Sequence, residues 1–421
     1  MFKLGEHPAS LYFFIMREQI QNNIHKIIEA HNNIALEWAT GVGKSRAAIT
    51  LANSIIDKGY KNILLIVAET PHKNNWKKEF SKWQLKKCNL TIECYASLKK
   101  YKNTNWDMII FDEAHHLNSD LRISILETIK SKYIILLSAT LPGELMDNSL
   151  LGKLSSIYGN FITSKITLQQ AIENNILPEP KILLLPLDLD TTPNTETIVE
   201  EWGDKSKRIT FKCTYSQRWG ILKNKKRFPN VSLTITCSQL QKYEYYTEQY
   251  EFWKKRYMLT RNERIKNLWL QAGSKRKLYL GECKTKIAQI LINKLKSKRF
   301  ICFCTNIAQA DILNANNSIH SKKNNSLEII DNFNKKKINS LFAVGMLQEG
   351  QNLNDIQAGI IIQLDNAERA FIQKFGRSLR AESPVQYILY YKNTRDEEYL
   401  EKNVLEEINK DFINYIRLED I

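Results

Sequence analysis

The segment from Ala39 to Ser45, Ala-Thr-Gly-Val-Gly-Lys-Ser, combines the residue types that bind phosphate groups. Glycines let the backbone turn its N–H groups inward, and the N-terminus of a following helix adds partial positive charge. In this interpretation Lys44 reaches the β- and γ-phosphates of a nucleoside triphosphate, and Ser45 binds Mg²⁺. The full pattern has a glycine where Trp38 stands, so the prediction depends on an expected strand before the segment and a helix after it. The other residues predicted to surround the phosphates are Thr40, Gly41, Val42 and Gly43.

Two adjacent carboxylates, Asp112 and Glu113, follow the apolar run Met108–Phe111. Unpaired charges are unfavourable in a core, whereas the carboxyl edge of a parallel sheet is where such folds bind ligands. We therefore predict that Asp112 holds the metal and that Glu113 orients and deprotonates the attacking water. The alternative is an exposed acidic turn. His115 and His116 come next, but no third ligand at a fitting spacing makes them a metal site.

A third set of reactive side chains, Gln373, Arg377 and Arg380, is spaced by four and three residues, which places it on one helical stripe. Arginine donors directed at a triphosphate stabilise the charge that grows in the transition state. If they come from a second lobe, hydrolysis requires that two lobes close on the nucleotide. The alternative is a solvated basic helix face.

Elements that position these residues are readable in the first 180 residues. Short, wholly apolar runs alternate with helical patterns such as Ser45–Asp57, which indicates a parallel sheet covered on both faces. The fourth run leads into Ser138-Ala-Thr140, whose hydroxyl groups can bond to the acidic turn. The predicted strands are Asn33–Ala39, Ile63–Ala68, Met108–Phe111 and Tyr133–Ser138.

The same alternation returns near the end of the chain, with a helix expected at Ala308–Asn314 and another at Ala367–Arg380. We therefore expect two α/β domains, residues 1–180 and 181–421, with the crossing marked by prolines between positions 178 and 193. The predicted strands of the second domain are Phe300–Cys304, Leu341–Val344, Gly359–Leu364 and Gln386–Tyr391.

Residues 190–283 break this alternation and predict a mostly helical insertion. Val231–Cys237 alternates like a strand, and five aromatic residues then follow at helical spacing. We expect this aromatic stripe to pack inside the insertion, and the basic residues beside it to contact phosphates. The stripe is Tyr243, Tyr246, Tyr250, Trp253 and Tyr257, and the basic clusters are 225–227, 254–256 and 275–277.

The chain carries a formal net charge of +16 over 421 residues, which favours a polyanionic partner. Biased codon usage could also produce its many Lys, Asn and Ile residues, so the charge is supporting evidence only. No apolar run is long enough to cross a bilayer, and no signal peptide is expected, so we predict no membrane partner. The seven cysteines lack paired metal spacing and are expected to be reduced thiols.

In order and spacing, these motifs resemble helicase superfamily 2. The resemblance implies an α/β fold of two tandem RecA-like parallel-sheet domains, with ATP and Mg²⁺ bound between them. It also implies that Gln19 reads the adenine base and that Gly350 and Asn352 contact the ribose of ATP. The matching segments are Ala39–Ser45 for motif I, Asp112–His115 for motif II, Ser138–Thr140 for motif III, Glu349–Asn352 for motif V and Gln373–Arg380 for motif VI.

Residues that would face nucleic acid also follow from the resemblance. The sequence Asp-Glu-Ala-His with the ending Gly-Arg-Ser-Leu-Arg looks closer to DNA-acting members, such as restriction-enzyme motor subunits and phage recombination helicases of the UvsW type. DNA is therefore favoured over RNA as the partner. The protein is expected in the cytoplasm of a bacterium or a phage-infected host. Two alternatives stay open: an RNA helicase with the same motor, or a motor subunit of a larger complex with protein partners in replication, recombination or restriction. The residues implied to contact nucleic acid are Thr70, Tyr95, Ser97, Thr305 and Asn306.

Overall fold

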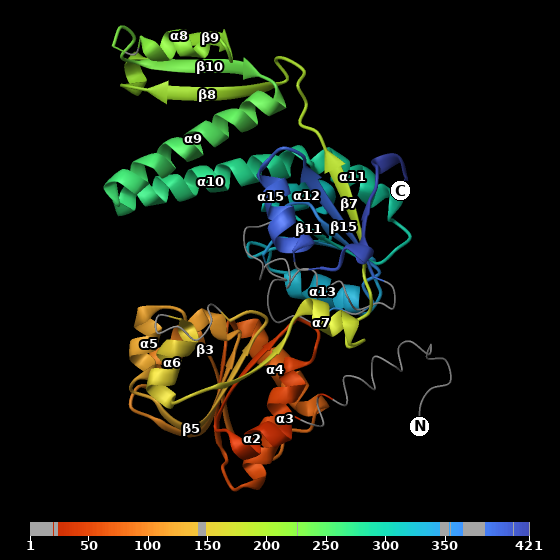
Figure 1. Ribbon diagram of the computed structural model, residues 1–421. Coiled ribbons are helices and arrows are strands. Elements are labelled where there is room, and N and C mark those ends of the chain that lie inside the picture. Colours follow the sequence, from red (N-terminus) through yellow and green to blue (C-terminus); the bar gives the residue numbers. More distant parts are fainter. Residues whose placement is uncertain are drawn as a thin grey trace.

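The computed structural model describes residue 20 and residues 24–141, 149–224, 226–345, 353, 355–364, 384–406 and 408–420. Two lobes are each built around a parallel sheet, and a long arm extends from the second lobe (Figure 1). The predicted fold class, two parallel-sheet α/β domains, is confirmed.

Lobe 1 contains a six-stranded sheet in the order β3-β2-β4-β5-β1-β6, with every pair of neighbours parallel. The four predicted strands are all present, whereas β3 and β6 were not predicted because their side chains are mostly exposed or half-buried at the two sheet edges. The strands are β1 (Asn33–Trp38), β2 (Asn62–Val67), β3 (Asn89–Cys94), β4 (Asn105–Asp112), β5 (Lys130–Ser138) and β6 (Ile162–Ile166).

Helices cover both faces of this sheet, because alternate residues of each central strand point to opposite sides. Ile63 and Leu65 pack on the side of α3, whereas Leu64 and Ile66 pack on the side of α5 and α6. The elements between the strands are α2 (His25–Ala30), α3 (Lys44–Asp57), α4 (Thr70–Lys82), η1 (Tyr95–Tyr101), η2 (Ala114–Leu117), α5 (Asp120–Leu126) and α6 (Leu150–Tyr158).

The chain crosses between the lobes through α7 (Leu168–Glu173), which follows the last strand of lobe 1. The side-chain oxygen of Gln169 accepts a hydrogen bond from the Asn409 N–H group of lobe 2 at 3.0 Å. The prolines predicted to mark the crossing are Pro178, Pro180, Pro186 and Pro193, and the first two lie in it. Pro186 instead lies inside strand β7, paired with Tyr390, so it does not mark the boundary.

Lobe 2 contains a seven-stranded parallel sheet in the order β12-β13-β11-β14-β15-β7-β16. The four predicted strands are present and β7, β12 and β16 are additional. The predicted helix Ala367–Arg380 lies outside the described residues. The strands are β7 (Lys181–Leu187), β11 (Phe300–Phe303), β12 (Ser318–Ile319), β13 (Ser340–Ala343), β14 (Ala358–Ile361), β15 (Val385–Tyr391) and β16 (Ile413–Tyr415).

The helical elements of lobe 2 cover both faces of the sheet (Figure 1). They are α11 (Thr285–Lys294), α12 (Ile307–Asn314), α13 (Ser326–Asn334), α15 (Arg395–Leu400), η4 (Glu401–Leu405), η5 (Lys410–Phe412) and η6 (Leu418–Asp420).

The insertion forms the arm. A three-stranded sheet in the order β8-β10-β9 carries α8, and a hairpin of two long helices, α9 and α10, returns the chain to lobe 2 (Figure 1). The prediction of a mostly helical insertion with one strand was right about the aromatic helix α9 and about β10 but missed β8 and β9. The elements are β8 (Glu196–Trp202), η3 (Lys205–Lys207), β9 (Ile209–Thr214), α8 (Arg218–Lys223), β10 (Val231–Cys237), α9 (Gln239–Thr260) and α10 (Glu263–Cys283).

Aromatic side chains hold α9 and α10 together, as predicted for the tyrosine stripe. Trp269 of α10 lies against Tyr250 and stacks on Tyr257, with ring centroids 6.0 and 5.5 Å apart. Arg276 is buried over the Tyr250 ring at 4.2 Å, so the predicted phosphate contact is wrong for this member of the basic cluster 275–277. Long as α9 and α10 are, neither they nor any other helix in the described ranges is apolar enough to cross a membrane.

Candidate functional site

The glycine-rich loop lies at the carboxyl edge of the lobe 1 sheet, between β1 and α3. Gly41 and Gly43 have φ angles of 96° and 110°, a backbone region that glycine enters without strain. Gly43 is also the N-cap of α3, so the helix N-terminus begins at Lys44. This combination of turned backbone and helix N-terminus is the geometry that binds an anion.

Trp38 explains why the loop lacks the usual first glycine. It is the last residue of β1, it is 1% exposed, and its indole N–H donates to the Ser164 hydroxyl of β6 at 3.0 Å. The tight turn of the loop therefore begins after Trp38, one residue later than in the full phosphate-loop pattern. The Lys44 ammonium donates to the Trp38 carbonyl at 2.8 Å, which holds this side chain across the loop.

Asp112, the last residue of β4, is fixed by two aromatic residues. The Trp76 indole N–H of α4 donates to its Oδ2 at 2.7 Å, and the Tyr95 hydroxyl donates to its main-chain carbonyl at 2.9 Å. Trp76 is 3% exposed and Tyr95 is 4% exposed. A buried indole N–H requires an acceptor, and here a predicted metal ligand provides it.

Glu113 has φ 51° and ψ 55°, a left-handed conformation that costs a non-glycine residue roughly 1–3 kcal/mol. Such conformations concentrate at functional sites, where the surrounding structure maintains them. The Glu113 carboxylate lies 3.4 Å from Nδ1 of the buried His115, which is 3.2 Å from the Ser138 hydroxyl. Ser138 donates in turn to the Thr140 carbonyl at 2.6 Å, so motifs II and III are joined by direct contacts.

The loop and the carboxylates share one edge of the sheet. Leu36 of β1 and Asp112 of β4 both pair with Leu137 of β5, so the three residues form one row. Because neighbouring strands are ~4.8 Å apart, β1 and β4 are about 10 Å apart along that row. A triphosphate held by the loop would therefore extend toward Asp112 and Glu113.

Oxygen ligands for a divalent metal are present at this edge. Ser45 offers a hydroxyl at the start of α3 and Asp112 a carboxylate, and Mg²⁺ prefers such ligands with the remainder supplied by water and phosphate. Among the described residues, no three His, Cys, Asp or Glu side chains form a metal-binding cluster.

Several predicted nucleotide contacts lie outside the described residues. These predictions concern Gln19, Gly350, Asn352, Gln373, Arg377 and Arg380.

The predicted nucleic-acid contacts of lobe 1 differ in their surroundings. Thr70 is exposed at the first position of α4, and Ser97 is half-buried in η1. Tyr95 is buried, stacked on Phe111, and bonded to Asp112, so the structure does not support it as a surface contact. It belongs to the layer beneath the acidic pair.

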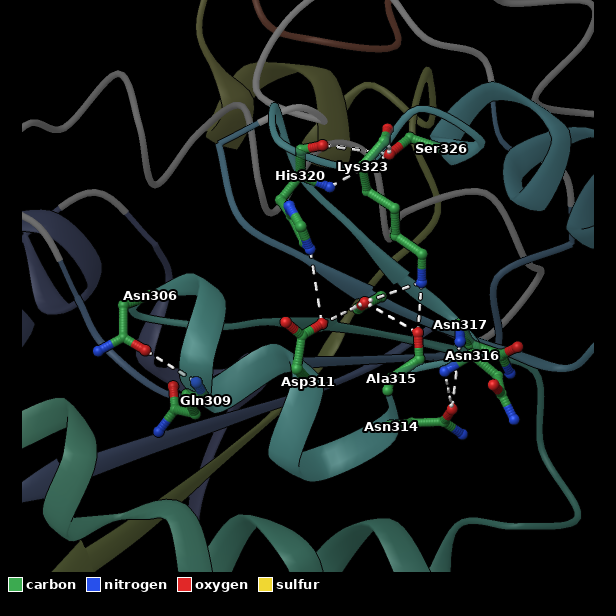
Figure 2. A network of polar contacts seen from close by, with 11 residues as sticks. Asn306, Gln309, Asp311, Asn314, Ala315, Asn316, Asn317, His320, Lys323 and Ser326 are labelled. Atoms are coloured by element: carbon green, nitrogen blue, oxygen red, sulfur yellow. Dashed lines mark hydrogen bonds and ion pairs between the residues drawn. The ribbon is translucent and has the colours of Figure 1, made fainter.

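In lobe 2, Thr305 and Asn306 follow β11 and lie against the end of the arm. The Asn306 side chain caps α12 by accepting from the Gln309 N–H at 2.8 Å, as Figure 2 shows, and donates to Glu282 of α10 at 2.9 Å. The Gln309 amide donates to the Gly281 carbonyl at 2.8 Å. A Cβ on Gly281 would lie 2.1 Å from the Thr305 hydroxyl oxygen, so the Thr305 side chain packs directly on the α10 backbone where any larger residue would clash.

Further along α12, a polar network ties the helix to β12 (Figure 2). Asp311 accepts from the Ser318 hydroxyl at 2.6 Å and lies 3.5 Å from Nε2 of His320. Lys323 donates to the Ser318 hydroxyl at 3.1 Å. These contacts fix the position of α12 and therefore of Asn306 at its N-terminus.

A buried ion pair fixes the other side of the arm's attachment. Lys284, between α10 and α11, is fully buried and lies 2.5 Å from Asp396 of α15. Its ammonium also donates to the Gln363 side chain at 3.0 Å, and Gln363 donates to Asp396 at 2.6 Å. Burial lowers the pKa of Lys284, and Asp396 opposes that shift.

Trp76 is the residue of this site that the sequence did not reveal. It stands in the polar run His-Lys-Asn-Asn-Trp-Lys-Lys, where a single tryptophan is most simply interpreted as the packing residue of a helix. Its contact with Asp112 depends on how α4 lies against the sheet, and no local pattern predicts that. Lys284 and Asp396 were missed for the same reason.

A glycine-rich loop and an acidic pair at one edge of a parallel α/β sheet form the arrangement that is typical of nucleoside triphosphatases. Two family models match the chain: type III restriction enzyme, res subunit, at residues 15–100 and 86–143, and helicase conserved C-terminal domain at residues 283–382. The first model covers Lys44 with its range 15–100 and Asp112 with its range 86–143, and the second model covers Arg377 and Arg380. Residues 144–282, with the arm, lie outside both ranges.

Among solved structures, the helicase domain of Hef from Pyrococcus furiosus is similar, with a TM-score of 0.47 and 13% identity over 92% of this chain and 97% of that chain. No curated protein matches the sequence. The two family models together support a helicase of superfamily 2. Domains of this kind imply an enzyme that hydrolyses ATP and binds nucleic acid.

Proposed function

We propose that this chain is an ATP-dependent DNA helicase or translocase that uses Mg²⁺. The observation that carries the proposal is the shared sheet edge of lobe 1, where Lys44 at the start of α3 and the Asp112–Glu113 pair at the end of β4 flank one position for a triphosphate. The matches of family models to segments of both lobes support a motor over a simple nucleotide-binding module.

In the proposed cycle, the glycine-rich loop and Lys44 hold the β- and γ-phosphates. Mg²⁺, when bound by Ser45 and Asp112, neutralises charge on those phosphates. Glu113 accepts a proton from the attacking water. We assign Gln373, Arg377 and Arg380 to the γ-phosphate side, where they stabilise transition-state charge once the lobes close. Closing with ATP and opening after hydrolysis then move the protein along its track.

The first test changes the two sides of the phosphate site separately. Lys44→Ala and Glu113→Gln should each abolish ATP hydrolysis stimulated by nucleic acid, with Glu113→Gln retaining ATP binding because the phosphate loop is unchanged. The measurement is steady-state ATP hydrolysis beside equilibrium binding of a fluorescent ATP analogue. Full hydrolysis in either variant would refute the assignment of the site.

The preference for DNA needs a separate comparison. ATP hydrolysis should be stimulated more by single-stranded, duplex or forked DNA than by RNA of equal length and at the same salt concentration. Stronger stimulation by RNA would favour an RNA helicase with the same motor. Weak hydrolysis that rises only on addition of a partner protein would favour a motor subunit of a restriction or repair assembly.

A further inference from the structure

The far end of the helical hairpin carries a concentration of positive charge. We define the hairpin tip as residues 254–266, which hold six basic residues and one acidic residue. Lys255, Arg256, Arg261 and Arg264 are exposed there. The tip therefore carries five of the chain's sixteen net positive charges in thirteen residues.

The tip also exposes apolar side chains that the hairpin does not use. Leu259 is 78% exposed, more than any other large apolar side chain in the described ranges, and Met258 beside it is 45% exposed. Lys255 and Leu259 are four residues apart on α9, so they are neighbours on one helical face. That face is opposite the tyrosines that pack on α10.

The hairpin is built to hold this tip away from the lobes. α9 has 22 residues and is therefore ~33 Å long. Close packing stiffens the pair: a Cβ on Gly273 would lie 3.2 Å from the Tyr250 ring, and Trp269 fills the space nearer the tip. In Figure 1 the turn between α9 and α10 lies apart from both lobes.

The root of the hairpin is fastened to lobe 2, so the two must move together. The main-chain N–H of Arg395 donates to the Tyr243 hydroxyl of α9 at 2.9 Å. On α10, the Gly281 carbonyl is held by Gln309, and Lys284 just beyond is paired with Asp396. Any rotation of lobe 2 is thus carried to the tip.

We infer that the hairpin tip is a nucleic-acid contact separate from the two lobes, which binds the backbone of duplex DNA about ten base pairs from the lobes, with Leu259 pressed against the bases or sugars. Positive charge at this density matches phosphates, and an apolar side chain between basic ones is the pattern of proteins that insert into a groove. A duplex suits the separation, because DNA is stiff over ~150 base pairs whereas a single strand is flexible. The inference rests on the proposed function and deepens it.

The test compares two triple variants that remove equal charge. Lys255→Gln, Arg256→Gln and Arg264→Gln neutralise the tip. As a control, Lys296→Gln, Lys298→Gln and Lys337→Gln neutralise exposed residues in the loops before β11 and β13. These loops lie at the amino edge of the lobe 2 sheet, opposite to the carboxyl edge where α10 attaches.

Binding of a labelled duplex of ~30 base pairs and a single strand of ~10 nucleotides is measured by anisotropy over a series of salt concentrations. We expect the tip variant to bind the duplex at least tenfold more weakly, with the slope of log K against log salt shallower by ~0.9 for each phosphate that the tip no longer neutralises. Its binding of the short strand, and ATP hydrolysis stimulated by that strand, should equal those of the control variant.

Leu259→Ala, compared with Ile312→Ala on lobe 2, tests the apolar contact: it should weaken duplex binding several-fold without changing the salt slope. Ile312 is 71% exposed and so is matched in exposure. If wild-type protein is stimulated by DNA but the tip variant binds the duplex as the control does, the inference fails alone. If the tip variant loses affinity only for duplex RNA, the DNA contact is refuted. If wild-type protein neither binds nor responds to DNA, both proposals fail.

Discussion

Trp76 is where the structure adds most to the chemistry that the sequence predicts. Its indole N–H bonds to one oxygen of Asp112, and groups that orient a metal ligand commonly affect metal affinity or activity 10–100-fold. Trp76→Phe keeps the ring and removes the donor. We expect the variant to need about tenfold more Mg²⁺ for half-maximal ATP hydrolysis.

The same region supplies a matched control. Trp83 follows α4, and its indole N–H donates to Glu79 at 2.8 Å, a carboxylate outside the candidate site. Trp83→Phe removes the same type of hydrogen bond but should leave the Mg²⁺ requirement as in wild type. Equal Mg²⁺ titrations for both variants would mean that Trp76 only fills space.

Side-chain types and spacing were enough to predict that the loop, the acidic pair and the hydroxyls of Ser138 and Thr140 each lie at the end of a buried strand. The same reasoning could not separate Tyr95 from exposed contacts, since burial depends on the packing of η1 over Phe111. Nor could it show the left-handed backbone of Glu113, which arises from the turn between β4 and η2.

Among the elements of lobe 1 and the arm, burial decided which strands could be predicted. β1, β2, β4 and β5 are central and each contains a buried, mainly apolar run, so the sequence shows them clearly. β3, β6, β8 and β9 are edge strands with exposed positions, and their patterns resemble loops. The aromatic helix α9 was predicted because its aromatic residues recur at helical spacing, whereas its pairing with α10 was not.

The junction between the arm and lobe 2 depends on the buried Lys284–Asp396 pair. Removing one partner of such a pair commonly costs ~3–5 kcal/mol, because the other charge stays buried. Lys284→Met should therefore lower the free energy of opening of the β15 and α15 amides by about that amount. Native-state hydrogen exchange measures the change for each segment.

Lys335→Met is the comparison, because Lys335 and Asp331 form an exposed pair with side chains 61% and 55% accessible. We expect a loss of only ~0–1 kcal/mol in that case. The double change Lys284→Met with Asp396→Leu should recover much of the stability. A small effect of Lys284→Met would mean that Gln363 and the Tyr391 N–H satisfy Asp396 without the lysine.

At the scale of the whole molecule, the two lobes differ in how their sheets close. Every strand of the lobe 1 sheet comes from Asn33–Ile166, whereas β7 of lobe 2 lies between β15 and β16, which are formed more than 190 residues later. We predict that removing residues 384–421 leaves lobe 1 folded but prevents lobe 2 from folding.

Hydrogen exchange on the shortened chain tests this prediction. Amides of β1, β4 and β5 should stay protected, whereas those of β11 and β13 should exchange freely. ATP binding by the shortened chain would also show that the lobe 1 site is intact. Protection of β11 in the shortened chain would show that the sheet of lobe 2 forms without β15 and β16.

The position of β7 therefore has a consequence for synthesis on the ribosome. Ile182, Leu183, Leu184 and Leu185 are made with the first half of the chain but have no strand to pair with until β15 emerges. At 5–20 residues per second, that wait is roughly 10–40 s. During this time the unpaired apolar segment lies beside a folded lobe 1. A chaperone that binds the segment would therefore raise the yield of active protein.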